Sequence, residues 1–199
     1  YKRQIVSDAY LSRIDLTADE PEPEHIQITD DLIDPPLAEE VVLDPMGATA
    51  IVRQFGASDL VHVDLDLLER TPLDVGDNPT DLDITPDGTE LVVVARGSGE
   101  LWVYDLADPF DSQSVLSLPD ETVFGSVVLS PDNARGLLYS TASGASLYAR
   151  WDRGSDAVVL RDLVKPVQGV GISPTGGTAI ISHSAANGTD VDASSPYYN

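Results

Sequence analysis

The stretch Thr85-Pro86-Asp87-Gly88 is one of four copies of a turn signature that recurs along the chain. The other copies are Asp44-Pro45-Met46-Gly47, Ser130-Pro131-Asp132-Asn133 and Ser173-Pro174-Thr175-Gly176. Proline at the second position presets φ, and the Gly or Asn that follows tolerates positive φ, so the chain reverses direction here. The prolines are 41, 45 and 43 residues apart. A period of about 40 to 50 residues made of strands and turns is typical of a β-propeller with one blade per repeat.

The residues around each turn predict four strands per repeat. Apolar side chains stand two and four residues before each turn proline, which is the period-2 alternation of a strand with one face in a core. A second strand follows each turn, a connector of small residues comes next, and a third strand ends in an acidic residue. The predicted third strands are Leu60 to Asp64, Leu101 to Asp105 and Leu147 to Asp152. A weaker fourth strand completes each repeat, so the sequence predicts an all-β propeller of four-stranded antiparallel blades.

This pattern predicts about four and a half blades within a single propeller. Complete blades are expected at 36–76, 77–120 and 121–164. Residues 1–35 are expected to form the back half of a blade, with its last strand from His25 to Thr29, and an acidic link. Residues 165–199 are expected to form the front half of a blade and a polar loop.

The second repeat resembles one particular family of propellers. Its residues are Val75-Gly76-Asp77-Asn78-Pro79, Leu82 to Gly88, Leu91 to Ala95 and Leu101-Trp102-Val103-Tyr104-Asp105. This stretch looks like one repeat of the YVTN family, which is similar in fold to lactonase-type and WD40-type propellers. The resemblance spans about residues 36 to 183. The pair Trp151-Asp152 also resembles the WD40 signature, but it occurs once and no Gly-His dipeptide precedes any blade.

Two explanations are open for the half-blades at the ends of the chain. Residues 1–31 could pair with residues 173–199, which would close a four-bladed ring and remove exposed strand edges. Alternatively, the chain is a piece of a longer propeller of six to eight blades. The resemblance to YVTN-like propellers, which are seven-bladed rings, favours the second explanation.

The charge of the chain limits its partners. The 199 residues include 11 Lys and Arg against 34 Asp and Glu, a formal net charge of −23. Such a surface repels phosphate backbones and anionic lipids, so a nucleic-acid partner is not expected. No run of 18 apolar residues occurs, so no membrane span is expected. The absence of cysteine excludes disulfides, zinc–thiolate sites and cysteine nucleophiles. The resemblance to YVTN-like propellers implies an extracytoplasmic location: periplasmic, cell-surface or secreted.

Acidic residues around one link between blades suggest a metal site. Asp74, Asp77, Asp81 and Asp83 are close together in sequence, and hard oxygen ligands of this kind suit Ca²⁺. They do not follow the spacing of a calcium-binding EF-hand loop. We therefore also keep the simpler interpretation, in which these carboxylates are chance neighbours in a very acidic chain.

A second candidate site lies where the innermost strands begin. The likeness to lactonase-type propellers implies functional groups at the start of the innermost strand and in the loop before it. The matching positions lie five and six residues before each turn proline, and their polar members are Glu39, Glu40, Thr80, Asp81, Ser126 and Gln168. Convergent polar groups of this kind would form a ligand site at the mouth of the channel. The alternative is that they only solvate the channel.

No catalytic motif accompanies this pattern. No G-x-S-x-G sequence occurs, and the three histidines belong to different repeats. We therefore expect a non-enzymatic binding or scaffold module with a protein or small-molecule partner. The alternatives are a lactonase-like hydrolase that uses Glu39, Glu40 and Asp81 with a divalent cation, and a subunit of a self-associating surface assembly.

Overall fold

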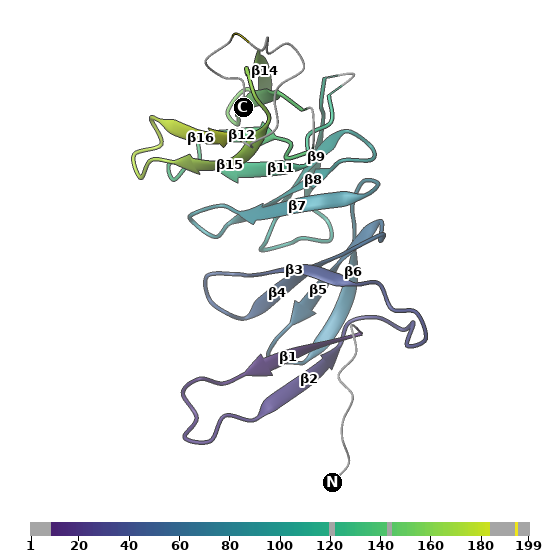
Figure 1. Ribbon diagram of the computed structural model, residues 1–199. Coiled ribbons are helices and arrows are strands. Elements are labelled where there is room, and N and C mark those ends of the chain that lie inside the picture. The colour runs from purple at the N-terminus through teal and green to yellow at the C-terminus, as the bar shows by residue number, and fades with distance from the viewer. Residues whose placement is uncertain (1–8, 120–121, 143–144, 184–193, 195–199) are drawn as a thin grey trace. The chain divides into compact units, whose positions relative to one another are not determined.

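The computed structural model describes residues 9–119, 122–142, 145–183 and 194 (Figure 1). The predicted polar loop after His183 lies outside these residues, apart from Ser194. The described residues form strands and turns and contain no helix. The chain divides into two compact units, Tyr1–Pro79 and Thr80–Asn199.

The first unit contains a two-stranded and a four-stranded antiparallel sheet. The small sheet pairs β1 (Tyr10–Ile14) with β2 (Pro23–Gln27). The large sheet follows chain order through four strands: β3 (Ala38–Leu43), β4 (Thr49–Gln54), β5 (Asp59–Asp64) and β6 (Glu69–Asp74). The two sheets pack through a shared core that includes Ile26, Ile28, Val52 and Val63.

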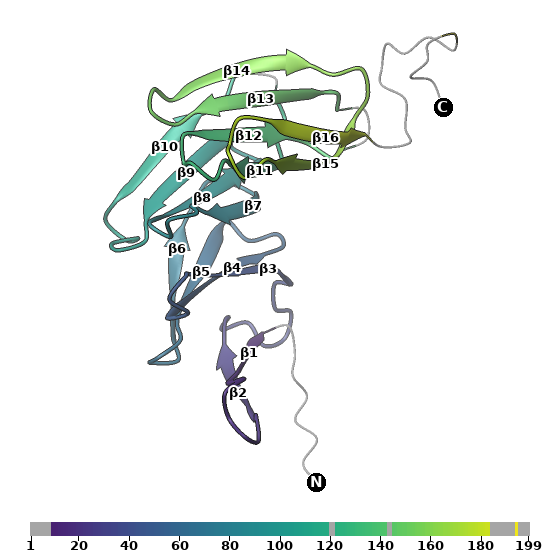
Figure 2. The same ribbon diagram turned by 90° about the vertical axis from the view of Figure 1, so that its left-hand side faces the viewer.

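The second unit contains two four-stranded sheets and one two-stranded sheet. The first sheet orders β7 (Pro79–Ile84), β8 (Glu90–Ala95), β9 (Glu100–Asp105) and β10 (Gln113–Ser117). The second orders β11 (Ser126–Leu129), β12 (Arg135–Tyr139), β13 (Leu147–Asp152) and β14 (Ala157–Asp162). The third pairs β15 (Val167–Ile172) with β16 (Ala179–His183), which lie beside β11 and β12 in Figures 1 and 2.

These sheets confirm the prediction of an all-β chain with antiparallel four-stranded sheets. Some boundaries differ from the expectation by one or two residues: β5 and β9 begin at Asp59 and Glu100, one residue early, and β2 ends at Gln27 instead of Thr29. Strand β2 begins at Pro23, two residues before the predicted start at His25, because Pro23 pairs with Ile14 beside the turn of the hairpin. Proline is tolerated as the first residue of an edge strand, where its missing N–H leaves no ladder bond unmade.

The four turn signatures fold in the same way. In each, the N–H of the fourth residue donates to the carbonyl of the first, with N–O distances of 2.7 to 3.0 Å. The side-chain oxygen of the first residue also accepts the N–H five residues further on, as in the 2.8 Å bond from Thr49 to Asp44. The fourth residue has a φ between 58° and 73°, which glycine adopts without strain and asparagine tolerates. These residues are Gly47, Gly88, Asn133 and Gly176.

The aspartate that ends the third strand has a local structural role. The Asp64 carboxylate accepts the N–H groups of Asp66 and Leu67 at 2.9 and 2.8 Å. The Asp105 carboxylate accepts the N–H of Ala107 at 2.9 Å in the same way. An aspartate that binds backbone groups two residues on starts an Asx turn, which explains its recurrence at this position.

The core of the second unit lies between its two four-stranded sheets. Val92, Val94 and Leu101 pack against Leu138 and Trp151 of the following sheet. Trp151 is only 2% exposed and stands directly opposite Gly136 in the β12–β13 ladder. A Cβ atom on Gly136 would lie 2.9 Å from Cε3 of the Trp151 ring. The glycine therefore makes room for the largest side chain of this core.

Replacing Gly136 by alanine should destabilise the second unit, because the indole of Trp151 would have to shift within a packed core. The expected loss is about 1–3 kcal/mol of the free energy of unfolding, measured by urea denaturation. Gly171→Ala is the matched control, since Gly171 also lies in a strand but a Cβ atom added to it would meet no atom within 4 Å. Equal stability of the two variants would contradict this packing role.

Candidate functional site

The two predicted glutamates at the start of β3 share one arginine. The Arg53 guanidinium donates to the carboxylates of Glu39 at 2.7 Å and Glu40 at 3.0 Å. The ladder register shifts between Ala38 and Glu40, which makes Glu39 the extra residue of a β-bulge. The two charges raise the pKa of Arg53 although its burial opposes this change. Both glutamates are therefore partly neutralised by a residue of their own sheet.

The predicted residues of β7 bind the backbone of the next inner strand. The Thr80 hydroxyl donates to the Gly125 carbonyl at 2.9 Å. The Asp81 carboxylate accepts the Val127 N–H at 2.7 Å, and the Asp83 carboxylate accepts the Leu129 N–H at 3.2 Å. Strand β11 is the edge of its sheet, so these N–H groups face away from the β12 ladder. The two aspartates satisfy donors that would otherwise have no partner from the ladder.

One tyrosine that the sequence analysis missed joins this group. Tyr139 stands opposite Ser126 in the β11–β12 ladder. Burial raises the pKa of Tyr139, the charge of Asp81 raises it further, and a hydrogen bond with Ser126 lowers it. The phenol therefore stays protonated at neutral pH and can donate a hydrogen bond. The sequence did contain a signal for this residue: Tyr139 occupies the repeat position where the preceding repeat has the apolar Val94.

Gln168 occupies the same repeat position as Glu39. Its register also shifts, between Val167 and Gly169, so Gln168 is the extra residue of a second β-bulge. Its side chain is exposed and makes no hydrogen bond with any described residue. Bulges re-aim side chains and are frequent beside binding sites. Two of the predicted positions therefore coincide with local distortions that turn a polar side chain out of the ladder.

The structure brings the predicted residues together in two groups. Glu39 and Glu40 form one group in the first unit, with Arg53. Thr80, Asp81 and Ser126 form the other in the second unit, with Tyr139. Gln168 is joined to neither group by a hydrogen bond among the described residues.

The predicted calcium ligands also fall in both units. Asp74 ends β6 opposite Asp59, and Asp77 lies in the following turn; both Asp74 and Asp77 are exposed. Asp81 and Asp83 are engaged with β11. Within the described ranges, no three His, Cys, Asp or Glu side chains are grouped so as to hold a metal ion. Calcium binding stays a prediction.

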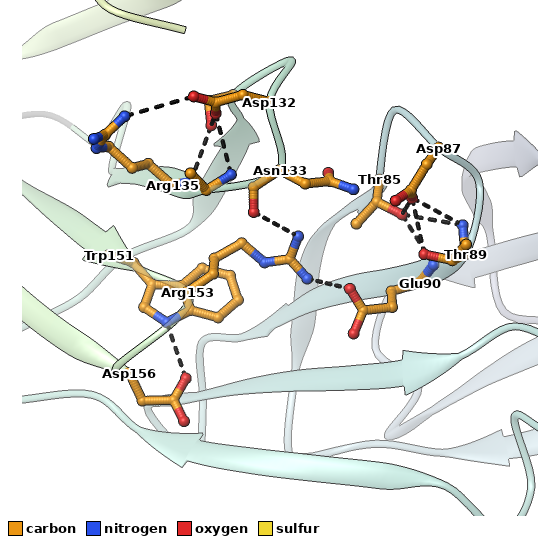
Figure 3. Close-up of polar contacts among 12 residues, drawn as sticks. Thr85, Asp87, Thr89, Glu90, Asp132, Asn133, Arg135, Trp151, Arg153 and Asp156 are labelled. Atoms are coloured by element: carbon orange, nitrogen blue, oxygen red, sulfur yellow. Dashed lines mark hydrogen bonds and ion pairs between the residues drawn. The ribbon is translucent and has the colours of Figure 1, made fainter.

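A second polar cluster lies beside the turns of the β7–β10 and β11–β14 sheets (Figure 3). Arg153 pairs with Glu90 of the neighbouring sheet, donates to the Asn133 carbonyl at 3.2 Å and lies 5.3 Å from the Trp151 ring centroid. Its side chain is 11% exposed. The indole N–H of Trp151 donates to Asp156 at 3.4 Å. The Arg153–Glu90 pair joins the two sheets beside an open depression of about 510 Å³, and the other contacts hold Arg153 and Trp151 within their own sheet.

The aspartate of the second turn is held by hydroxyl and amide donors. The Asp87 carboxylate accepts the Thr85 hydroxyl at 2.7 Å and the Thr89 hydroxyl at 2.8 Å. The Thr85 hydroxyl lowers the pKa of Asp87 most, followed by Thr89 and then the Asn133 side chain. The pKa lies well below the usual range for aspartate, so Asp87 is a charged structural acceptor at neutral pH.

No protein-family model matches the chain. No curated protein matches it either. Among solved structures, it is similar to hydrazine synthase of Kuenenia stuttgartiensis, with a TM-score of 0.61 and 22% identity over 78% of this chain and 44% of that one. It is also similar to a Bacteroides uniformis protein named "putative 6-phosphogluconolactonase", with a TM-score of 0.62 and 14% identity over 87% and 57% of the two chains. A functionally unknown protein from Desulfotomaculum acetoxidans matches with a TM-score of 0.62 and 18% identity over 89% and 57%.

These likenesses support a lactonase-like propeller fold. At these identities they concern the fold alone. The chain spans about half of the length of the solved structures it matches. The described residues hold no helix with the length and apolar character needed to cross a membrane.

Asp81→Ala should destabilise the second unit, because the buried Val127 N–H would lose its acceptor. The expected loss is about 1–3 kcal/mol in the free energy of unfolding, measured by urea denaturation. Asp77→Ala removes an exposed carboxylate that accepts no hydrogen bond among the described residues, and should change stability by less than about 0.5 kcal/mol. A smaller effect at Asp81 than at Asp77 would contradict the structural role of Asp81.

Asp87→Asn should lower the melting temperature at neutral pH, and the difference from the wild type should shrink in acid. The folded-state pKa is depressed, so the ionised carboxylate stabilises the fold above the unfolded pKa of about 3.9. This stabilisation is lost as the pH falls from there toward the folded-state pKa. Melting curves across this range test the sign, and Asp77→Asn controls for removing one charge. A difference that grows in acid would overturn the assignment.

Proposed function

We propose that the chain is a non-enzymatic, extracytoplasmic binding or scaffold module built on a YVTN-like propeller. Its binding surface lies where the inner strands begin, at Gln168 and at the group of Thr80, Ser126 and Tyr139. The observation that carries this proposal is the use of the candidate catalytic carboxylates within the fold. Glu39 and Glu40 are paired with Arg53, and Asp81 accepts a backbone N–H.

Those contacts argue against general acid–base roles. A catalytic base needs a free lone pair within reach of the proton that it removes. An ion pair with arginine stabilises the charged form of a carboxylate and makes it a weaker base. Hydroxyl, phenol and amide groups, by contrast, bind a ligand by hydrogen bonds without changing their own protonation. The polar groups at these strand starts are mainly of this second kind.

The alternative is a lactonase-like hydrolase that uses Glu39, Glu40 and Asp81 with a divalent cation such as Ca²⁺. The similarity in fold to the Bacteroides uniformis structure supports this alternative. This support for the hydrolase is an analogy of fold, and one fold hosts many unrelated functions. A third proposal is a subunit of a surface assembly.

An assay for hydrolysis of 6-phosphogluconolactone distinguishes the binding-module proposal from the hydrolase alternative. We expect the chain to give no rate above buffer, with or without added CaCl₂, because the acids are held by structural partners. The rate of hydrolysis is measured from the acid that is released as the lactone opens. A rate that EDTA abolishes and Glu40→Gln reduces by about a hundredfold or more would establish the hydrolase and reject our proposal.

The binding surface is tested directly with a photo-crosslinking residue at position 168. We expect adducts in an extracytoplasmic extract of the source organism from this position, and none when the same residue replaces Thr175, which is exposed on the turn of the same sheet. Adducts of equal yield from both positions would reject the surface.

A further inference from the structure

One contact between the β7–β10 and β11–β14 sheets departs from the pattern of the repeats. The residue after the third-strand aspartate is leucine in three repeats and arginine in one: Leu16, Leu65, Leu106 and Arg153. The residue four places after the turn proline also varies, and it is acidic once: Thr49, Glu90, Arg135 and Thr178. The single arginine of the first set and the single carboxylate of the second form an ion pair between these two sheets.

The backbone shows that Arg153 occupies the same structural position as the leucines. In each case the N–H of this residue donates to the carbonyl three places after the turn proline, at 2.9 Å for Leu65 and Leu106 and 3.1 Å for Arg153. Leu65 is buried in the core that its sheet shares with the preceding one. Arg153 also contacts the preceding sheet, but through Glu90, and its side chain is 11% exposed (Figure 3). A charged contact has therefore taken the place of an apolar one.

The charged contact is a poor source of stability. The Nε atom of Arg153 is buried and has no hydrogen-bond partner among the described residues, which costs free energy. Taking two charges out of water also offsets much of their mutual attraction. A leucine at this position would bury apolar area without these costs. The pair is better suited to discrimination between neighbours, because a nearly buried charge disfavours any neighbour that does not carry the opposite one.

Wrong pairings of the sheets lack this complementarity. The sheets of a repeat protein share one shape, so misassembly is a characteristic error of such proteins. If the β3–β6 sheet took the place of β11–β14, Leu65 would face Glu90 and leave its carboxylate without a cation. If the β11–β14 sheets of two chains stacked on each other, Arg153 would face Arg135, a like charge. Among the repeats of this chain, only the native order brings opposite charges together at this position.

We propose that the Glu90–Arg153 pair selects which sheet packs beside β7–β10 and so fixes the order of these repeats during folding. The contacts of Asp81 and Asp83 with β11 do not make this selection, because they bind backbone N–H groups that every inner strand offers. Registry and choice of partner are the best-attested uses of buried polar and charged groups. The pair lies between two complete four-stranded sheets, and its role does not depend on the binding surface proposed above.

The test uses two introduced cysteines, since the chain has none of its own. The Thr80 hydroxyl oxygen lies 3.8 Å from the place of a Cβ atom on Gly125, beside the neighbouring sheet. Thr80→Cys with Gly125→Cys therefore allows a disulfide within one chain when β7–β10 and β11–β14 are adjacent. This reporter chain is unfolded in urea, refolded by dilution and then oxidised. Mass spectrometry after thiol labelling gives the fraction of chains with the internal disulfide.

We expect the reporter to lose fidelity without losing stability when the pair is replaced by the residues of other repeats. Glu90→Thr with Arg153→Leu should leave the midpoint of urea unfolding unchanged or higher, and should lower the disulfide fraction about twofold or more. Glu90→Asp with Arg153→Lys keeps both charges and should retain the fraction. Asp30→Thr with Arg70→Leu is the matched control, since it removes an ion pair of the first unit and should also retain the fraction.

Two outcomes would overturn the proposal. An unchanged disulfide fraction in the neutral double variant would show that the pair does not select the neighbouring sheet. A urea midpoint that falls together with the fraction would identify the pair as a stabilising contact only. If the neutral double variant does not refold, Glu90→Gln decides, because it removes the charge and keeps an acceptor for Arg153; it should lower the fraction, and an unchanged fraction rejects the proposal. Circular dichroism before oxidation establishes that each variant is folded.

Discussion

The arrangement of the second unit depends on one requirement. The N–H groups on the unpaired side of strand β11 need hydrogen-bond acceptors. Strand β11 is paired on one side only, and an unpaired N–H that is removed from water is costly. Asp81 and Asp83 meet this demand from the neighbouring sheet because they are two residues apart and so point the same way along β7. The same contacts bring the apolar faces of the two sheets together over Trp151. Burial of this core then supplies the non-directional part of the stability.

The acidic composition of the chain has two different structural uses. Some carboxylates accept local N–H and hydroxyl groups, as Asp64 and Asp87 do at turns. Others act between strands or sheets, as Glu90 does on Arg153. Both uses depend on where the carboxylate lies relative to its donor groups. In both, hydrogen bonding favours the ionised form of the carboxylate. The number of acidic residues therefore does not give the number of carboxylates available to bind a metal or a substrate. The position of each carboxylate in the fold decides whether it has a structural partner.

The two proposals depend on different chemistry. The Glu90–Arg153 pair uses opposite charges between neighbouring sheets. The strand starts of the second unit offer neutral donors and acceptors, and a bulge turns Gln168 out of its ladder. A rigid sheet framework with variable side chains at such places is common among binding proteins. A lactonase-like propeller fold is compatible with this function, since fold and chemistry are separable.

The sequence by itself determined the strands and turns of this protein. The turn signatures, the two-residue alternation and the aspartate that ends each third strand depend on local backbone geometry, so they can be recognised without a structure. Only the tertiary structure decided the roles of the polar residues. The partner of Asp81 is the N–H of Val127, 46 residues further along the chain, and the partner of Glu90 is Arg153, 63 residues further. The role of Tyr139 likewise depends on which sheet faces are covered, and coverage is a property of packing that no local pattern contains.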